Sequence, residues 1–75
     1  MIRVGDIIKV KSSAGSELRS MGFDKEYCQQ IQEEYSGTMH RVNYVWTDQN
    51  KQLFCTIETG IDLPIFCVES EGTLC

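Results

Sequence analysis

The residues of this chain best suited to chemistry are one histidine, His40, and four cysteines. A thiol and an imidazole can act as nucleophile and base when they lie within hydrogen-bond reach of each other. Cys55 is the best-placed thiol, because its strand is expected to pair with the strand that holds His40. However, Cys55 shares one face of its strand with Leu53 and Ile57, which predicts a buried, unreactive thiol. We therefore expect a protein that is not an enzyme, with a pair of Cys55 and His40 as the one catalytic alternative.

Metal and nucleotide sites are not expected either. A structural zinc site usually contains two cysteines only a few residues apart, whereas the cysteines here are widely separated, at Cys28, Cys55, Cys67 and Cys75. The six glycines are scattered singly, so no glycine-rich loop is available to hold a phosphate. The sequence predicts no metal ion and no cofactor.

The length and the distribution of apolar residues predict one small domain. The 75 residues allow a single core, expected over residues 3–69, with a frayed tail at 70–75. The apolar runs are far shorter than the ~20 residues of a membrane-spanning helix. The N-terminus carries Asp6 where a signal peptide needs an unbroken apolar stretch. We therefore expect a cytoplasmic protein without a membrane partner, whose cysteines stay reduced.

The first half of the chain predicts a strand followed by helices. Apolar and polar residues alternate over residues 4–10, which is typical of a half-buried strand. Asp24 can cap a helix, and an apolar stripe at helical spacing follows it, made of Tyr27, Cys28, Ile31 and Tyr35. Residues 16–36 are thus expected to form a helical excursion between the first and second strands.

The second half predicts an antiparallel meander. Residues 38–46 and 52–58 are rich in β-branched and aromatic residues, and the polar run 47–51 can turn the chain between them. Pro64 suits the start of a last short strand at 65–68. The predicted fold class is mostly β, with four or five antiparallel strands and a small α insertion.

This order of segments resembles an SH3-like small barrel. The resemblance covers residues 3–69 by pattern and depends on three stretches: Val4-Gly5-Asp6-Ile7-Ile8-Lys9-Val10, Ser16-Glu17-Leu18 to Phe23, and Gly37-Thr38-Met39. Among such barrels the chain is similar to short reading frames of phages, prophages and gene cassettes. The resemblance implies a protein encoded on a mobile element.

Aromatic residues form the candidate binding surface. Tyr44 and Trp46 fall on one face of strand 38–46, and the meander can bring Phe54 and Phe66 near them. Tryptophan and tyrosine offer rigid apolar area with a polar group, which suits a ligand groove. In the alternative, the helical stripe covers these aromatic residues and they form a second small core.

The charge distribution narrows the choice of partner. The net charge is −4, and residues 42–75 hold Lys51 against five carboxylates. Non-specific nucleic-acid binding needs a basic surface, and the one candidate patch consists of Arg3, Lys9, Lys11 and Arg41. We expect a module that binds a protein partner or its own copy, and no small molecule. The alternatives are an acidic inhibitor of a host nucleic-acid-processing or defence protein, and a weak nucleic-acid-binding accessory domain.

Overall fold

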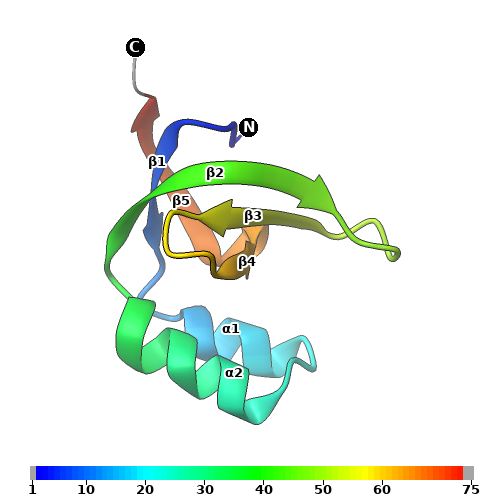
Figure 1. The fold of residues 1–75 in the computed structure, drawn as a ribbon. Helices are drawn as coiled ribbons and strands as arrows, with labels where there is room; N and C mark the ends of the chain where they lie inside the picture. The colour runs from blue at the N-terminus through cyan, green and yellow to red at the C-terminus, as the bar shows by residue number, and fades with distance from the viewer. Residues whose placement is uncertain (1, 74–75) are drawn as a thin grey trace.

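The computed structural model describes residues 2–73 and contains one antiparallel sheet with two helices packed against it (Figure 1). In chain order its elements are β1 (Asp6–Val10), α1 (Ala14–Ser20), α2 (Lys25–Gln30), the π-helical turn η1 (Ile31–Tyr35), β2 (Met39–Thr47), β3 (Leu53–Ile57), β4 (Asp62–Pro64), the 3-10 turn η2 (Ile65–Cys67) and β5 (Val68–Thr73). The prediction of a mostly β chain with antiparallel strands is confirmed.

The sheet is strongly curled and not closed. Its order is β4-β3-β2-β1-β5, so the two edge strands are joined in the chain only by the three residues of η2. Five flat strands would span about 19 Å, whereas three residues of 3-10 helix rise only about 6 Å. β2 therefore bends, pairing with β1 through residues 39–41 and with β3 through residues 42–47 (Figure 1).

The expectation of a frayed tail is wrong for the residues that the structure describes. Residues 68–73 form β5, which pairs with β1 from Val68 opposite Val10 to Thr73 opposite Asp6. Val68 is buried, but Glu69, Ser70 and Glu71 are exposed. Backbone hydrogen bonds to β1 therefore hold this strand in place. Its exposed side chains are polar, so the sequence shows no apolar alternation that would predict a strand here. Residues 74–75 lie outside the described residues.

The predicted last strand at 65–68 is also wrong. Ile65–Cys67 form a 3-10 turn, and the preceding strand ends at Pro64. The chain has to pass here from one sheet edge to the other, which requires a turn. The carbonyl of Cys67 accepts a hydrogen bond of 2.9 Å from the backbone N–H of Lys11, which fixes η2 beside the end of β1.

The first strand starts later than expected. Val4 is exposed and lies before the strand, in a turn that Gly5 allows through its φ of +94°. The buried face of β1 consists of Asp6, Ile8 and Val10. The carboxylate of Asp6 accepts a hydrogen bond from the backbone N–H of Arg3 at 2.8 Å, which offsets part of the cost of burying it.

The helices form a layer beneath the sheet (Figure 1). Asp24 caps α2 by accepting hydrogen bonds from the backbone N–H groups of Glu26 and Tyr27, as its position predicted. α1 meets α2 and η1 at Gly15, where a β-carbon would lie 2.6 Å from Cβ of Gln32 in η1. The Gln32 amide uses this close approach to accept from Gly15 N–H and to donate to the carbonyl of Ser12.

The core lies between the curled sheet and this helical layer. It contains Ile8, Val10, Leu18, Ile31, Val42, Cys55, Ile57 and Leu63, each almost completely buried. The stripe residues Tyr27 and Tyr35 pack against this cluster from the helical side. No helix within residues 2–73 is long and apolar enough to cross a membrane.

Candidate binding surface

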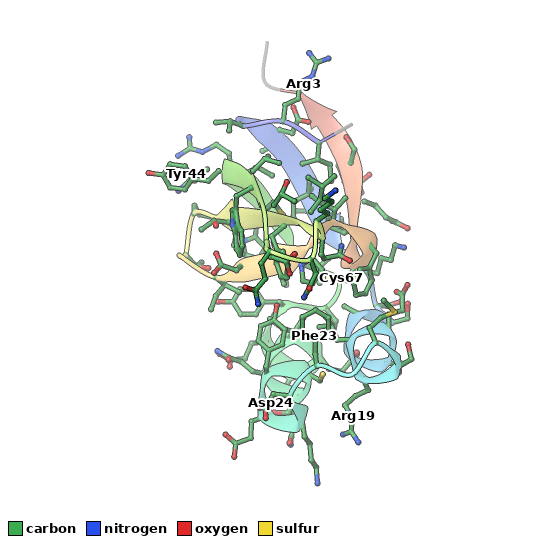
Figure 2. The ribbon with its side chains drawn as sticks, turned by 90° about the vertical axis from the view of Figure 1, so that its right-hand side faces the viewer. Arg3, Arg19, Phe23, Asp24, Tyr44 and Cys67 are labelled. Carbon is green, nitrogen blue, oxygen red and sulfur yellow. The ribbon has the colours of Figure 1, made fainter. Side chains whose placement is uncertain are left out.

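The aromatic pair of Trp46 and Phe54 is the centre of the candidate surface. The two residues lie opposite each other on β2 and β3, with ring centroids 4.6 Å apart and ring planes 11° apart. Phe54 is buried, whereas Trp46 keeps 38% of its surface exposed. Tyr44 lies two residues before Trp46, is 66% exposed and points away from the ribbon (Figure 2). Phe54 thus packs in the interior, while Trp46 and Tyr44 form an exposed aromatic surface above it.

A chain of hydrogen bonds fixes the Trp46 ring. Its indole N–H donates to the hydroxyl of Thr56 at 3.0 Å, and that hydroxyl donates to the Asp62 carboxylate at 2.6 Å. The backbone carbonyl of Asp62 accepts from the Tyr27 hydroxyl, also at 2.6 Å. These contacts tie three strands and α2 together around one aromatic ring. Trp46 is therefore held in place without a ligand.

Phe23 is the residue of this region that the sequence pattern missed. It lies in the link between α1 and α2, outside the apolar stripe, and sits between the helical layer and the sheet (Figure 2). Its ring centroid is 6.3 Å from Phe54 and 6.3 Å from Phe66. Phe23 therefore packs near both Phe54 and Phe66. Its place directly before the Asp24 cap was the available signal, because residues at that position often pack against the helix that follows.

The helical stripe does not cover the exposed aromatic residues. Tyr27 donates to the carbonyl of Asp62 at the start of β4, and the Tyr35 hydroxyl lies 3.3 Å from that of Thr59 in the turn before β4. Of the four aromatic residues proposed from the sequence, Tyr44 and Trp46 are open, Phe54 is buried and Phe66 is half-buried.

The four basic residues do not form one patch. Arg3 lies at the end of the molecule opposite the helices (Figure 2), while Lys11 forms an ion pair of 3.7 Å with Glu17 of α1. Lys9 and Arg41 share a sheet face, since Lys9 lies opposite Met39 and Arg41 opposite Ile7. Glu69 lies opposite Lys9 on its other side. Lys9 and Lys11 also line one surface pocket, so three of the four cations lie close together and Arg3 lies apart.

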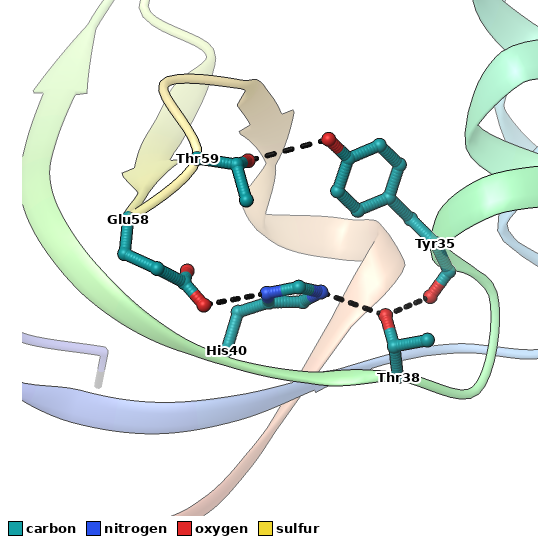
Figure 3. Close-up of polar contacts among 5 residues, drawn as sticks. All are labelled: Tyr35, Thr38, His40, Glu58 and Thr59. Carbon is teal, nitrogen blue, oxygen red and sulfur yellow. Dashed lines mark hydrogen bonds and ion pairs between the residues drawn. The ribbon is translucent and has the colours of Figure 1, made fainter.

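His40 belongs to a separate polar network (Figure 3). Its Nδ1 lies 2.7 Å from the Glu58 carboxylate and its Nε2 lies 2.8 Å from the Thr38 hydroxyl. The Thr38 hydroxyl also donates to the carbonyl of Tyr35. A nucleophilic hydroxyl would have to give its proton to the imidazole, but here that proton is directed at a backbone carbonyl. The network links β2, the turn after β3 and the end of η1, and it serves to hold them together.

The structure does not bring His40 to a cysteine. Within residues 2–73, the recorded hydrogen bonds of His40 go to Glu58 and Thr38 only. Burial, followed by the nearby Asp62 charge, raises the pKa of Cys55 to about 11. Burial, followed by the nearby Cys55, raises the pKa of Cys67 to about 12. Such thiols are protonated at neutral pH and are poor nucleophiles. No cluster of three metal-ligating side chains is found among the described residues.

Exposed carboxylates gather where the helical layer meets the turn between β3 and β4. The tyrosine hydrogen bonds described above join these segments, and the segments carry Glu26, Glu34, Glu58 and Asp62, all exposed. Residues 26–40 and 52–73 contain no lysine and no arginine. We call these four carboxylates the acidic face.

Comparison with protein-family models, with curated proteins and with solved structures finds no match for this chain. The function proposed below therefore depends on the geometry of the chain's own residues. The feature that combines exposure with a fixed conformation is the surface of Tyr44 and Trp46, supported from beneath by Phe54.

Proposed function

We propose that the chain is a non-enzymatic protein-binding module that receives a partner on Tyr44 and Trp46. The observation that carries this proposal is the fixed, open indole of Trp46, stacked on Phe54 and hydrogen-bonded to Thr56. Tryptophan and tyrosine are enriched among residues that dominate binding energy. A side chain already held in one conformation loses little entropy when a partner docks. Binding is therefore favoured at this surface over the rest of the sheet.

The SH3-like barrel interpretation is part of this proposal. The curl of the sheet, the bend of β2 and the short η2 connection between the two edge strands support it. The origin on a mobile element and the cytoplasmic location remain predictions that depend on the sequence alone.

A comparison of bait proteins tests the proposal. The wild-type chain, a Tyr44→Asp variant and a Met21→Asp variant are used to capture proteins from the native host. Both substituted residues are exposed, at 66% and 61%, and Met21 follows α1, away from β2. We expect a protein retained by wild type and Met21→Asp but lost by Tyr44→Asp. Equal retention by all three baits would contradict the proposal. Light scattering on the purified chain shows whether the partner is a second copy.

A second candidate function is inhibition of a basic, nucleic-acid-processing protein. The acidic face favours this candidate, because four exposed carboxylates can oppose a nucleic-acid-binding surface. A competition experiment tests this inhibition directly. The captured partner is first bound to nucleic acid, and we expect it to release the nucleic acid when the chain is added. Direct nucleic-acid binding has less support, because Lys11 is paired with Glu17 and Arg3 lies apart from Lys9 and Arg41.

A further inference from the structure

Trp46 and Asp62 are close neighbours that no sequence pattern links. One hydroxyl, that of Thr56, bonds to both of them, at 3.0 Å and 2.6 Å, so the indole nitrogen and the carboxylate oxygen lie within about 6 Å of each other. An aromatic face and a carboxylate at this separation match the two groups that a guanidinium contacts.

The Trp46 ring can interact with a ligand mainly through its open face. One face of the indole is covered by Phe54, and its only polar hydrogen is used by Thr56. The remaining exposed area is aromatic, which attracts a cation through the ring quadrupole. Of the aromatic side chains, tryptophan does this best.

The Asp62 carboxylate has capacity for a partner. It accepts from Thr56 through Oδ1, and it is exposed. The ion pairs within the described residues are those of Lys11 with Glu17 and of His40 with Glu58, so no lysine or arginine of the described chain neutralises Asp62. Asp62 is also a member of the acidic face, whose other members are carboxylates, with Lys25 and Arg41 at its borders.

We infer that Trp46 and Asp62 together bind an arginine side chain presented by a basic protein partner. This inference rests on the proposed protein-binding function and names the chemistry of its partner. A guanidinium is planar, so it can stack on the indole while its edge donates two hydrogen bonds to the carboxylate. A lysine ammonium cannot stack in this way, and it holds its water more tightly. The surrounding carboxylates attract the basic segment that carries the arginine.

Peptide binding to the complete chain tests this inference. Fluorescently labelled nonapeptides of arginine and of lysine are titrated with the chain at low ionic strength, and the anisotropy of the label is followed. We expect the arginine peptide to bind at least about fivefold more tightly than the lysine peptide. Equal affinity for the two peptides, or no binding of either, would overturn the inference.

Three variants separate a specific site from general charge attraction. Asp62→Asn and Trp46→Leu should each weaken arginine-peptide binding by about tenfold, because each removes one of the two contacts. Glu69→Gln is the matched control: it removes the same charge on β5, and should change binding less than about twofold. An equal loss with Glu69→Gln and Asp62→Asn would contradict a defined site.

A variant that keeps the net charge, checked for folding, distinguishes loss of the site from a change in charge or a folding defect. Thr56→Val breaks the bridge between the ring and the carboxylate without changing the net charge, and should weaken arginine-peptide binding by about threefold or more. Unchanged binding by a folded Thr56→Val variant, judged by circular dichroism, would count against the inference. If the Tyr44→Asp bait still loses its partner while the peptides bind equally, the proposed function stands and the arginine inference fails.

Discussion

Trp46 lies flat against Phe54, with the ring centroids 4.6 Å apart, yet one of the two residues is buried and the other is open. Phe23 holds Phe54 from the interior at 6.3 Å, while Thr56 holds Trp46 at its edge. The same stack therefore contributes to the core through one ring and offers a surface through the other. Substitutions of the buried ring should therefore lower stability, whereas substitutions of the exposed aromatic residues should mainly affect binding.

Substitution of Phe54 and of Tyr44 should show this separation. Phe54→Ala removes a buried ring with aromatic neighbours on two sides and should lower the free energy of unfolding by about 3 kcal/mol. Tyr44→Ala removes an exposed ring and should change it by less than about 0.5 kcal/mol. Urea unfolding of the two variants measures both values. A large destabilisation by Tyr44→Ala would mean that this residue is part of the core.

The contact of Gly15 with Gln32 should make α1 intolerant of a larger residue. Gly15→Ala places a β-carbon 2.6 Å from Cβ of Gln32 and disturbs the amide that bonds to Gly15 and Ser12. We expect a loss of about 1–3 kcal/mol in the free energy of unfolding, although alanine favours helices intrinsically. Ser16→Ala, at an exposed position of the same helix, is the control and should be neutral or slightly stabilising. A stabilising Gly15→Ala would show that the helices can move apart freely.

The buried thiols should make stability depend on alkaline pH. The folded-state pKa of Cys55, about 11, and that of Cys67, about 12, both lie above the ordinary value of 9.0. As pH rises past 9, the unfolded chain loses these thiol protons first, so the free energy of unfolding falls toward pH 11, by on the order of 2 kcal/mol for each thiol. Below pH 9 this contribution is fully present.

Urea unfolding at several pH values, together with alkylation of the folded chain, checks this expectation. Peptide mapping should find Cys55 and Cys67 unmodified at pH 8, and Cys55→Ala should make the decline between pH 9 and pH 11 less steep. Rapid modification of Cys55 in the folded chain would instead show an accessible thiolate and would restore a catalytic interpretation.

The His40 network should contribute to local order. His40→Ala removes contacts with Glu58 and Thr38 that join β2 to the turn after β3 and to the end of η1, and we expect the free energy of unfolding to fall by about 1–2 kcal/mol. Hydrogen exchange should rise around residues 36–41 more than in β5. Uniform exchange throughout the sheet would indicate that the network does not hold this corner.

The parts of the fold that follow from burial could be predicted from the sequence. Tyr27, Cys28, Ile31 and Tyr35 face the core because their helical spacing requires a common face, and Asp24 caps α2 because its carboxylate can reach the free N–H groups. The turn at 48–52 has a similar local cause, since Asp48 accepts from the backbone N–H groups of Asn50 and Gln52.

The parts that depend on long-range contacts could not be predicted in this way. β5 pairs with β1 through its backbone, so Glu69, Ser70 and Glu71 carry no apolar alternation. The run from Ile65 to Val68 looks like a buried strand, and only the position of β4 and β5 at opposite edges of the sheet makes a turn necessary. The link between Trp46 and Asp62 also arises only when three strands are in register.

Crosslinking at Tyr44 tests the central claim most directly. A photoreactive amino acid is placed at position 44 or, as the control, at position 21, and the chain is irradiated inside the native host. Both positions are exposed. We expect a discrete adduct with one protein from position 44 and none from position 21. The absence of any adduct at position 44, or the same adducts from both positions, would contradict a binding surface on Tyr44 and Trp46.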